Sequence, residues 1–252
     1  MAKTVPALSV DLFEVDRLRL TEVEAPRLSS DDAAARDRVW DEAVRANPSL
    51  FDGPVVACAG LEWEGPRSLV LLWARVTYRH YALRRVAGNS SWLPSLFVNV
   101  VQPTADARVL VGRMSPSTAA PGRWQLPGGS VEPPEEGAAL DEDALRRHAA
   151  RELAEETGVD LSSSELVLWA VTRGEHRSIG FTFLASPRPA SLLGERFEAV
   201  TRSEHAQGRK PELDRFAFVG SPAELAALDG PRVDYLDPIV RRHARESLRR
   251  DT

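Results

Sequence analysis

The sequence predicts an α/β fold in which strands and helices are interspersed along the chain, and two observations indicate this class. Short segments of alternating or continuous apolar residues, which are typical of strands, recur between residues 8 and 219. Among them lie runs with helical spacing and capping residues, of which the clearest extends from Asp141 to Gly158. A chain of 252 residues is long enough to bury a sizeable core as one large domain or one and a half.

The composition excludes several functional classes. Hydrophobic residues make up 43% of the chain and charged residues 27%, which is typical of globular proteins. The net charge is −5 and no basic tract stands out, so electrostatically driven nucleic-acid binding is not expected. The N-terminus lacks a signal-peptide pattern, and the longest apolar run, near Leu69–Ala74, is too short to cross a bilayer. We therefore expect a cytoplasmic protein without a membrane partner, in which the single cysteine, Cys58, is buried.

The first part of the chain is expected to contain two pairs of strands and two helices. The strands are expected over residues 8–13, 18–23, 55–62 and 68–77. The run Ser29-Ser30-Asp31-Asp32 offers an N-cap and an acidic first turn for a helix that Asn47 and Pro48 end. A second helix is expected to begin at Tyr78.

The later part of the chain is expected to begin with a buried strand over residues 95–101. We expect residues 109–114 to be its hairpin partner, and residues 165–172 and 179–185 to form another pair. The segment 187–211 reads as irregular, a candidate lid, with one further strand over 195–200. A strand over 215–219 and helices over 221–228 and 239–250 complete the chain.

The helix that ends at Gly158 carries the residues with the most chemical information. Glu152, Glu155 and Glu156 are spaced i, i+3 and i+4, so they project within about 100° of one another. Three close carboxylates repel one another unless basic side chains or a divalent cation neutralise them, and oxygen ligands favour Mg²⁺ or Mn²⁺. Taken alone, such a group is more often a solvated acidic face.

A glycine-rich segment upstream of the helix favours the metal interpretation. The run Trp124-Gln125-Leu126-Pro127-Gly128-Gly129 ends in a pair of glycines that allows close approach of the backbone to an ion or phosphate. Together with Arg151-Glu152-x-x-Glu155-Glu156-x-Gly158, this run resembles the Nudix box, G-x5-E-x7-R-E-U-x-E-E-x-G-U, in which U is a bulky aliphatic residue. The resemblance to the Nudix hydrolase superfamily implies an α/β/α sandwich with a mixed sheet over residues 93–252. An α+β extension over residues 1–92 would precede it.

The box is enlarged relative to the family pattern. Counting forward from Gly129, the first glutamate of the pattern is Glu135, whereas counting back from Arg151 leads to Asp143. The two positions differ by eight residues (143 − 135), so an insertion spans roughly residues 134–141. The sequence does not decide whether Glu135 or Asp143 fills the first-glutamate position.

The resemblance implies a metal-dependent pyrophosphohydrolase that acts on a small nucleotide. The residues implied to hold Mg²⁺, or Mn²⁺, are Gly129 through its carbonyl, Glu152, Glu155 and Glu156. Arg151 would orient these carboxylates. The general base stays open between Glu152 and Glu212, with Glu175 and Glu204 as weaker candidates. Arg113 occupies a strand position from which an arginine often faces the substrate phosphates in the family, although a strand-end arginine also commonly faces solvent.

A narrower resemblance concerns the front of the chain. The segments Ala46–Pro54 and Thr77–Tyr81 are similar to segments of animal UDP-glucose pyrophosphatase-type Nudix proteins, which also have an N-terminal extension and an enlarged box. This implies a UDP-sugar substrate such as UDP-glucose, cleaved to UMP and sugar 1-phosphate. Tyr78 would stack on uracil and Arg79 would contact phosphate, although each residue also has a purely structural interpretation.

Other functions and assemblies stay open at this point. ADP-ribose, a dinucleotide and an oxidised nucleotide are alternative substrates for the same chemistry. A catalytically silent Nudix ligand sensor is the alternative from a different functional class. The sequence leaves the oligomeric state undetermined, with a homodimer as one option.

Overall fold

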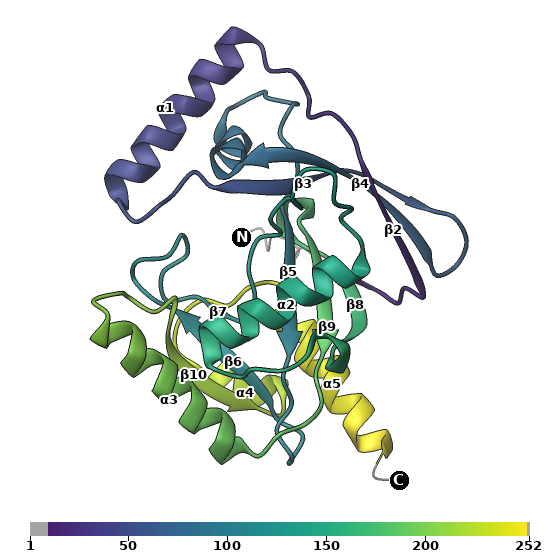
Figure 1. Ribbon diagram of the computed structural model, residues 1–252, viewed down its shortest axis with the longest axis vertical. Helices are drawn as coiled ribbons and strands as arrows, with labels where there is room; N and C mark the ends of the chain where they lie inside the picture. Colours follow the sequence, from purple (N-terminus) through teal and green to yellow (C-terminus); the bar gives the residue numbers. More distant parts are fainter. Residues whose placement is uncertain (1–9, 251–252) are drawn as a thin grey trace, which may run out of the picture.

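A four-stranded mixed sheet forms the centre of the fold (Figure 1). The computed structural model describes residues 10–250, with the backbone alone at Glu175 and Arg250, so residues 8 and 9 of the first expected strand lie outside the described residues. The strand order is β1-β8-β9-β5, with bounds Asp11–Phe13, Val167–Arg173, Ile179–Leu184 and Leu96–Val101. β8 pairs antiparallel with β1 and β9, and β9 pairs parallel with β5. The predicted pairing of the 165–172 and 179–185 segments is confirmed.

Both faces of this sheet are covered by helices because its strands carry apolar side chains on both sides. In β5, Val98 and Val100 belong to one buried cluster with helix α2 (Glu142–Thr157), whereas Phe97 and Val101 pack in a second cluster with helix α5 (Leu236–Arg250). This division follows the two-residue period of a strand. The predicted α/β/α sandwich with a mixed sheet is confirmed.

Helix α2 follows its sequence signals closely. The side chain of Asp141 caps its N-terminus, and Gly158 adopts the left-handed conformation at its C-terminus. The predicted apolar stripe of Leu145, Ala149 and Leu153 is fully buried against the sheet. Glu156 is buried as well, at 7% exposure, and lies beside this stripe at the interior edge of the helix.

The expected hairpin between residues 95–101 and 109–114 was wrong. Strand β6 (Val109–Met114) instead belongs to a second sheet of order β10-β6-β7, where β10 is Leu213–Val219 and β7 is Trp124–Gln125. β6 approaches the end of β5 only next to the turn that joins the two strands. There the Leu110 amide donates a 3.0 Å hydrogen bond to the Gln102 carbonyl. β6 then leaves the central sheet because its apolar residues pack with Trp124 and α5 in the second cluster.

The expectation of an irregular lid over residues 187–211, with a strand over 195–200, was also wrong. Residues Ala190–Ala206 form helix α3. Leu193 and Phe197, one helical turn apart, are buried, and the Phe197 ring lies 4.8 Å from the Phe216 ring of β10. The helix was missed because its N-cap is Pro189, which makes no side-chain capping hydrogen bond, so the usual start signal is lacking.

Apart from β1, which joins the central sheet, the chain before β5 forms an α+β extension at one end of the molecule, opposite α3 and β10 (Figure 1). Its sheet has the order β2-β4-β3, with bounds Arg17–Glu22, Ser68–Thr77 and Pro54–Trp63. Helix α1 (Ser30–Ala46) begins after the Ser29 cap and ends at Asn47, as predicted. The helix expected at Tyr78 is a 3₁₀ helix, η1 (Tyr78–Arg85).

The extension and the central sheet share one hydrophobic core. Val56, Leu71 and Trp73 of the extension belong to the same buried cluster as Val98 and Leu153. Cys58 is buried there, as expected, and burial raises the pKa of its thiol to about 11. The division between residues 92 and 93 stays a sequence prediction, since the packing across it is continuous.

Three short elements complete the description. They are η2 (Ser163–Glu165), η3 (Glu175–Arg177) and α4 (Pro222–Ala227), the last capped by Ser221 as predicted. Within residues 10–250, none of the helices combines the length and the apolar character that a membrane span requires.

Candidate active site

The loop that contains Gly128 and Gly129 lies directly against the last turns of α2. Gly128 has a φ of +151°, and a Cβ atom there would lie 2.1 Å from the Val98 carbonyl oxygen. A Cβ atom on Gly129 would lie 2.5 Å from Oε2 of Glu152. Glycine is therefore required at Gly128, where the clash is with the backbone of β5, whereas at Gly129 a Cβ atom would displace the Glu152 side chain. This approach brings backbone groups of the loop and carboxylates of α2 into one site.

Glu156 is the innermost carboxylate of this site. Only 7% of the residue is exposed, and its Oε2 accepts a 2.7 Å hydrogen bond from the Gly128 amide. Its Oε1 is buried and has no hydrogen-bond partner among the described residues. Burial, with the Glu212 carboxylate next in importance, raises the pKa of Glu156 well above its ordinary value. A buried carboxylate with an unsatisfied oxygen is costly unless a cation or proton joins it.

Glu212 joins the site from the segment between α3 and β10. Burial raises the pKa of its carboxyl, and the carboxylates of Glu152 and Glu155 raise it further. The pKa of Glu156 is likewise raised by Glu152 and Glu155, after burial and Glu212. Four carboxylates therefore lie within electrostatic reach of one another, although Glu212 is more than fifty residues away from the others in sequence.

Two basic side chains contact the outer carboxylates of the site. The Nε2 atom of His148 lies 2.8 Å from Oε1 of Glu152, one helical turn away. Arg151 donates a 3.0 Å hydrogen bond to Glu132, and its guanidinium lies 3.9 Å from Glu155. These contacts hold Glu152 and Glu155 in position without removing the negative charge at the centre.

Glu152 and Glu212 line a cleft of about 1020 Å³. The extension forms one wall through Ser49–Phe51 and Gly53–Val55, together with Tyr78 and Arg84. Gly128, Gly129 and Glu152 also line the cleft, as do Gly208–Lys210 and Glu212. Asn47 ties the wall to the 115–120 loop, because its side-chain amide donates a 2.9 Å hydrogen bond to the Thr118 carbonyl. The site is thus built from both the extension and the central domain.

Residues 95–230, more than half of the chain, match the family model described as the NUDIX domain. The chain belongs to the Nudix family. It is a Nudix pyrophosphohydrolase, an enzyme of a family that uses a divalent metal ion and acts on small molecules. No curated protein matches the chain.

This Nudix hydrolase is also similar, at low sequence identity, to several solved structures. A MutT protein from Methanosarcina mazei Go1 is 21% identical, with a TM-score of 0.39, over 61% of this chain and 96% of that chain. A NUDIX hydrolase from Nitrosomonas europaea is 19% identical, with a TM-score of 0.34, over 62% of this chain and 89% of that chain. At such TM-scores, neither likeness informs on the substrate.

The residues of the Nudix site fit a hard divalent cation by their chemistry. The unsatisfied Oε1 of Glu156 and the raised pKa values of Glu156 and Glu212 indicate uncompensated negative charge at this point. Within the described residues, no three acidic, histidine or cysteine side chains are already arranged to hold one ion. Glu152 and Glu155 would therefore have to turn away from His148 and Arg151 for all the carboxylates to bind together.

Tyr78 and Arg79, predicted to bind substrate, have different surroundings. Tyr78 lines the cleft, and its ring makes edge contacts with Trp40 and Tyr81. Arg79 is not a lining residue of this cleft; its backbone amide and guanidinium both donate to Asp52. Tyr78, but not Arg79, is therefore a lining residue of the cleft.

Arg113 lies on β6 and makes two 2.9 Å hydrogen bonds to the carboxylate of Asp214 on β10. It does not line the cleft. Among the weaker candidates for the base, Glu204 forms a two-pronged ion pair with Arg209. The side chain of Glu175 lies outside the described part of the chain. Glu152 and Glu212 are the two base candidates that line the cleft.

Several cleft residues were not proposed as site residues from the sequence, although Phe51 lies in the segment Ala46–Pro54. They are Phe51, Arg84, His176 and Lys210. Phe51 is 78% exposed, which is unusual for a phenylalanine, and it lines the cleft. No short-range pattern marks such residues, because they reach the cleft only through the folding of separate segments.

Proposed function

We propose that this Nudix hydrolase cleaves the pyrophosphate bond of a nucleoside diphosphate linked to another group, with a UDP-sugar such as UDP-glucose as substrate and Mg²⁺ as the metal. Mn²⁺ is the expected substitute. The observation that carries the proposal is the convergence of Glu152, Glu155, Glu156 and Glu212 beside a cleft with one wall made by the extension. That wall contains residues 49–51 and 53–54, which are part of the segment that resembles UDP-glucose pyrophosphatase-type proteins.

The acidic residues have separate roles in this proposal. The Gly129 carbonyl, Glu152, Glu155 and Glu156 would hold the metal, and Arg151 would keep the outer carboxylates oriented. A divalent cation bound there supplies charge neutralisation to the doubly anionic pyrophosphate, an effect worth several kcal/mol. The Gly129 carbonyl also accepts from the Val98 amide at 3.0 Å, which fixes its direction.

Glu212 is the better candidate for the general base. A base that acts near neutral pH needs a pKa close to that range, and burial raises the pKa of Glu212 toward it. Glu152, the alternative, already contacts His148. The base takes one proton from the attacking water, the water oxygen bonds to one phosphorus, and the bridging oxygen leaves with the second phosphate.

Aromatic residues of the extension are candidates for the base contact of the nucleotide. Tyr78 lines the cleft, and Phe51 presents an exposed ring on the same wall. A ring in this position can stack on uracil. Arg79 and Arg113 would contact phosphate only after exchanging their present carboxylate partners, Asp52 and Asp214. We therefore give them a supporting role.

Hydrolysis of a nucleotide-sugar panel with Mg²⁺, with products separated by chromatography, tests the proposal. UDP-glucose should yield UMP and glucose 1-phosphate, with oxygen-18 from solvent water in only one of the two phosphate products. Label in the anomeric hydroxyl, with UDP as the other product, would overturn the reaction class. Turnover of ADP-ribose without turnover of UDP-sugars would support the proposed pyrophosphate cleavage but reject a UDP-sugar as the substrate.

A further inference from the structure

We propose that Arg84 and His176 form an anion subsite on the extension side of the cleft, which binds a phosphate group of the substrate or product. The inference deepens the proposed function and rests on it for the identity of the substrate. Neither residue belongs to the box or to the carboxylate cluster. Arg84 comes from η1 of the extension, and His176 comes from the β8–β9 turn of the Nudix domain.

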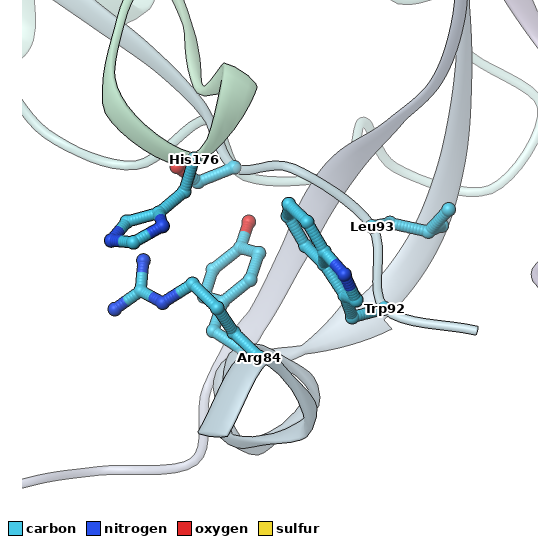
Figure 2. A pocket seen from close by; sticks show the side chains of 6 residues that line it. Arg84, Trp92, Leu93 and His176 are labelled. Carbon is cyan, nitrogen blue, oxygen red and sulfur yellow. The ribbon is translucent and has the colours of Figure 1, made fainter. Parts of the chain in front are cut away.

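The two side chains meet at a small recess that opens into the main cleft. Tyr81, Trp92 and Leu93 also line this recess, and Arg84, Ser95 and His176 line both the recess and the cleft. Figure 2 shows the Arg84 guanidinium directed toward the His176 imidazole, with Trp92 across the recess. Segments more than ninety residues apart in the chain thus converge on one point of the cleft wall.

Arg84 differs from neighbouring arginines in its charge balance. Arg79 pairs with Asp52 and Arg209 pairs with Glu204, whereas Arg84 forms no ion pair with a carboxylate within residues 10–250. A guanidinium is always charged and presents several N–H donors in a plane that matches phosphate oxygens. An arginine that lines an anion-processing cleft without a carboxylate partner is therefore available to the ligand.

Arg84 also lies within reach of the catalytic carboxylates. Burial raises the pKa of the Tyr78 hydroxyl, Arg84 acts on the same hydroxyl to lower it, and Glu212 acts to raise it. Arg84 and Glu212 therefore both lie close enough to Tyr78 to shift the pKa of its hydroxyl. A ligand bound at the carboxylates can extend along Tyr78 toward Arg84.

The backbone that carries His176 is in a conformation that disfavours its residue type. His176 and Arg177 both have a φ of +55°, in a turn closed by a 2.9 Å hydrogen bond from the Arg177 amide to the Gly174 carbonyl. Glycine or asparagine adopts positive φ with less strain. The Arg177 guanidinium lies 5.5 Å from the centre of the Trp92 ring, a contact that helps to hold the turn in place. Strained residues of this kind are concentrated at binding sites.

The chemistry of the pair suits a phosphate monoester. Arg84 supplies positive charge and a fork of donors, and His176 can add one ring N–H. When the bond between the two phosphates breaks, the departing phosphate gains negative charge. A subsite with two donors would stabilise that group as it leaves and would retain the product until it dissociates.

The test compares Arg84→Gln and His176→Asn with the matched control Arg85→Gln, which removes the same charge from the same element but does not line the cleft. Inorganic phosphate is titrated into the metal-free protein and followed by NMR. We expect each subsite variant to weaken phosphate binding about tenfold, the loss of one charge-assisted hydrogen bond, and the control to match wild type. Thermal melts should show that His176→Asn is at least as stable as wild type, because asparagine tolerates positive φ.

A second measurement identifies which phosphate occupies the subsite. Product inhibition of UDP-glucose hydrolysis is measured separately with UMP and with glucose 1-phosphate. Weaker inhibition by one product in both variants supports the subsite and assigns that half of the substrate to it. Unchanged phosphate binding in both variants, or equal weakening in Arg85→Gln, would overturn the proposal. The phosphate titration does not depend on hydrolysis. If UDP-sugars are not hydrolysed, the proposed function fails, but the titration still shows whether Arg84 and His176 bind phosphate.

Discussion

The guanidinium of Arg151 donates a hydrogen bond of 3.0 Å to the carboxylate of Glu132, nineteen residues earlier in the chain. The enlarged box left Glu135 and Asp143 as candidates for the first-glutamate position. Within the described residues, neither of them contacts Arg151, and Asp143 instead pairs with Arg146. We therefore infer that Glu132 supports Arg151, which in turn lies beside Glu155.

Replacing Glu132 by alanine should weaken metal binding by about tenfold, because Arg151 would lose the partner that orients it. The free energy of unfolding should change by less than about 1 kcal/mol, since both partners are roughly half exposed. Calorimetric titration with Mg²⁺ and urea unfolding measure the two effects. Glu135→Ala and Asp143→Ala are the controls, and equal losses of metal affinity in all three variants would contradict the assignment.

Replacing Glu156 by glutamine should lower metal affinity and turnover by about a hundredfold or more, because it removes the innermost charge of the cluster. Folding should survive or improve, because like-charge repulsion in the metal-free protein is relieved. Thermal melts with and without Mg²⁺ measure this. If the metal stabilised the variant as much as wild type, the metal assignment would be wrong.

The two glycines of the loop should respond differently to alanine. Gly128→Ala places a Cβ atom against the Val98 backbone at positive φ, so we expect a loss of at least about 2 kcal/mol in the free energy of unfolding. Gly129→Ala meets only the end of the Glu152 side chain, which can move. That variant should fold but lose most of its stabilisation by Mg²⁺ in thermal melts. Normal stabilisation by Mg²⁺ would show that Glu152 is not needed there.

Removing the exposed ring of Phe51 should affect substrate binding without affecting folding. Base stacking on an aromatic residue contributes about 1–3 kcal/mol, so Phe51→Ala should raise the KM for UDP-glucose about tenfold, whereas Phe51→Trp should retain it. The melting temperature should stay unchanged, because 78% of Phe51 is exposed. An unchanged KM in Phe51→Ala would show that the ring does not bind the nucleotide.

The buried His80 should make stability depend on pH. Burial, with a contribution from Arg36, lowers the pKa of His80 from 6.5 to about 4. Its Nε2 accepts a 3.1 Å hydrogen bond from the Leu93 amide, so the folded state requires the neutral ring. Between these two pKa values the unfolded chain binds more protons, and the free energy of unfolding therefore falls as the pH drops through this window.

Urea unfolding at about pH 7.5 and about pH 5 should reveal this loss in wild type. The variant His80→Gln keeps an acceptor for the Leu93 amide but does not titrate, so its stability should depend less on pH. An identical pH dependence in the two proteins would assign the effect to other groups.

The sequence by itself determined the elements whose signals are local. Helix α1 begins after Ser29 and ends at Asn47, and α2 extends from its Asp141 cap to Gly158, because capping and helical periodicity involve residues only a few positions apart. The spacing of Glu152, Glu155 and Glu156 on one side of α2 has the same origin. These local features, with the box that they form, were sufficient to predict the family.

Only the tertiary structure decided which distant segments meet. β6 pairs with β10 and not with β5, and α3 forms without a side-chain cap because Leu193 and Phe197 are buried against neighbouring elements. Glu132 reaches Arg151, and Glu212, Arg84 and His176 reach the cleft, through the packing of segments that are far apart in the chain. The physical reason is that burial of apolar surface acts between whole elements, so the partner of a strand or side chain depends on every other element that competes for the same core.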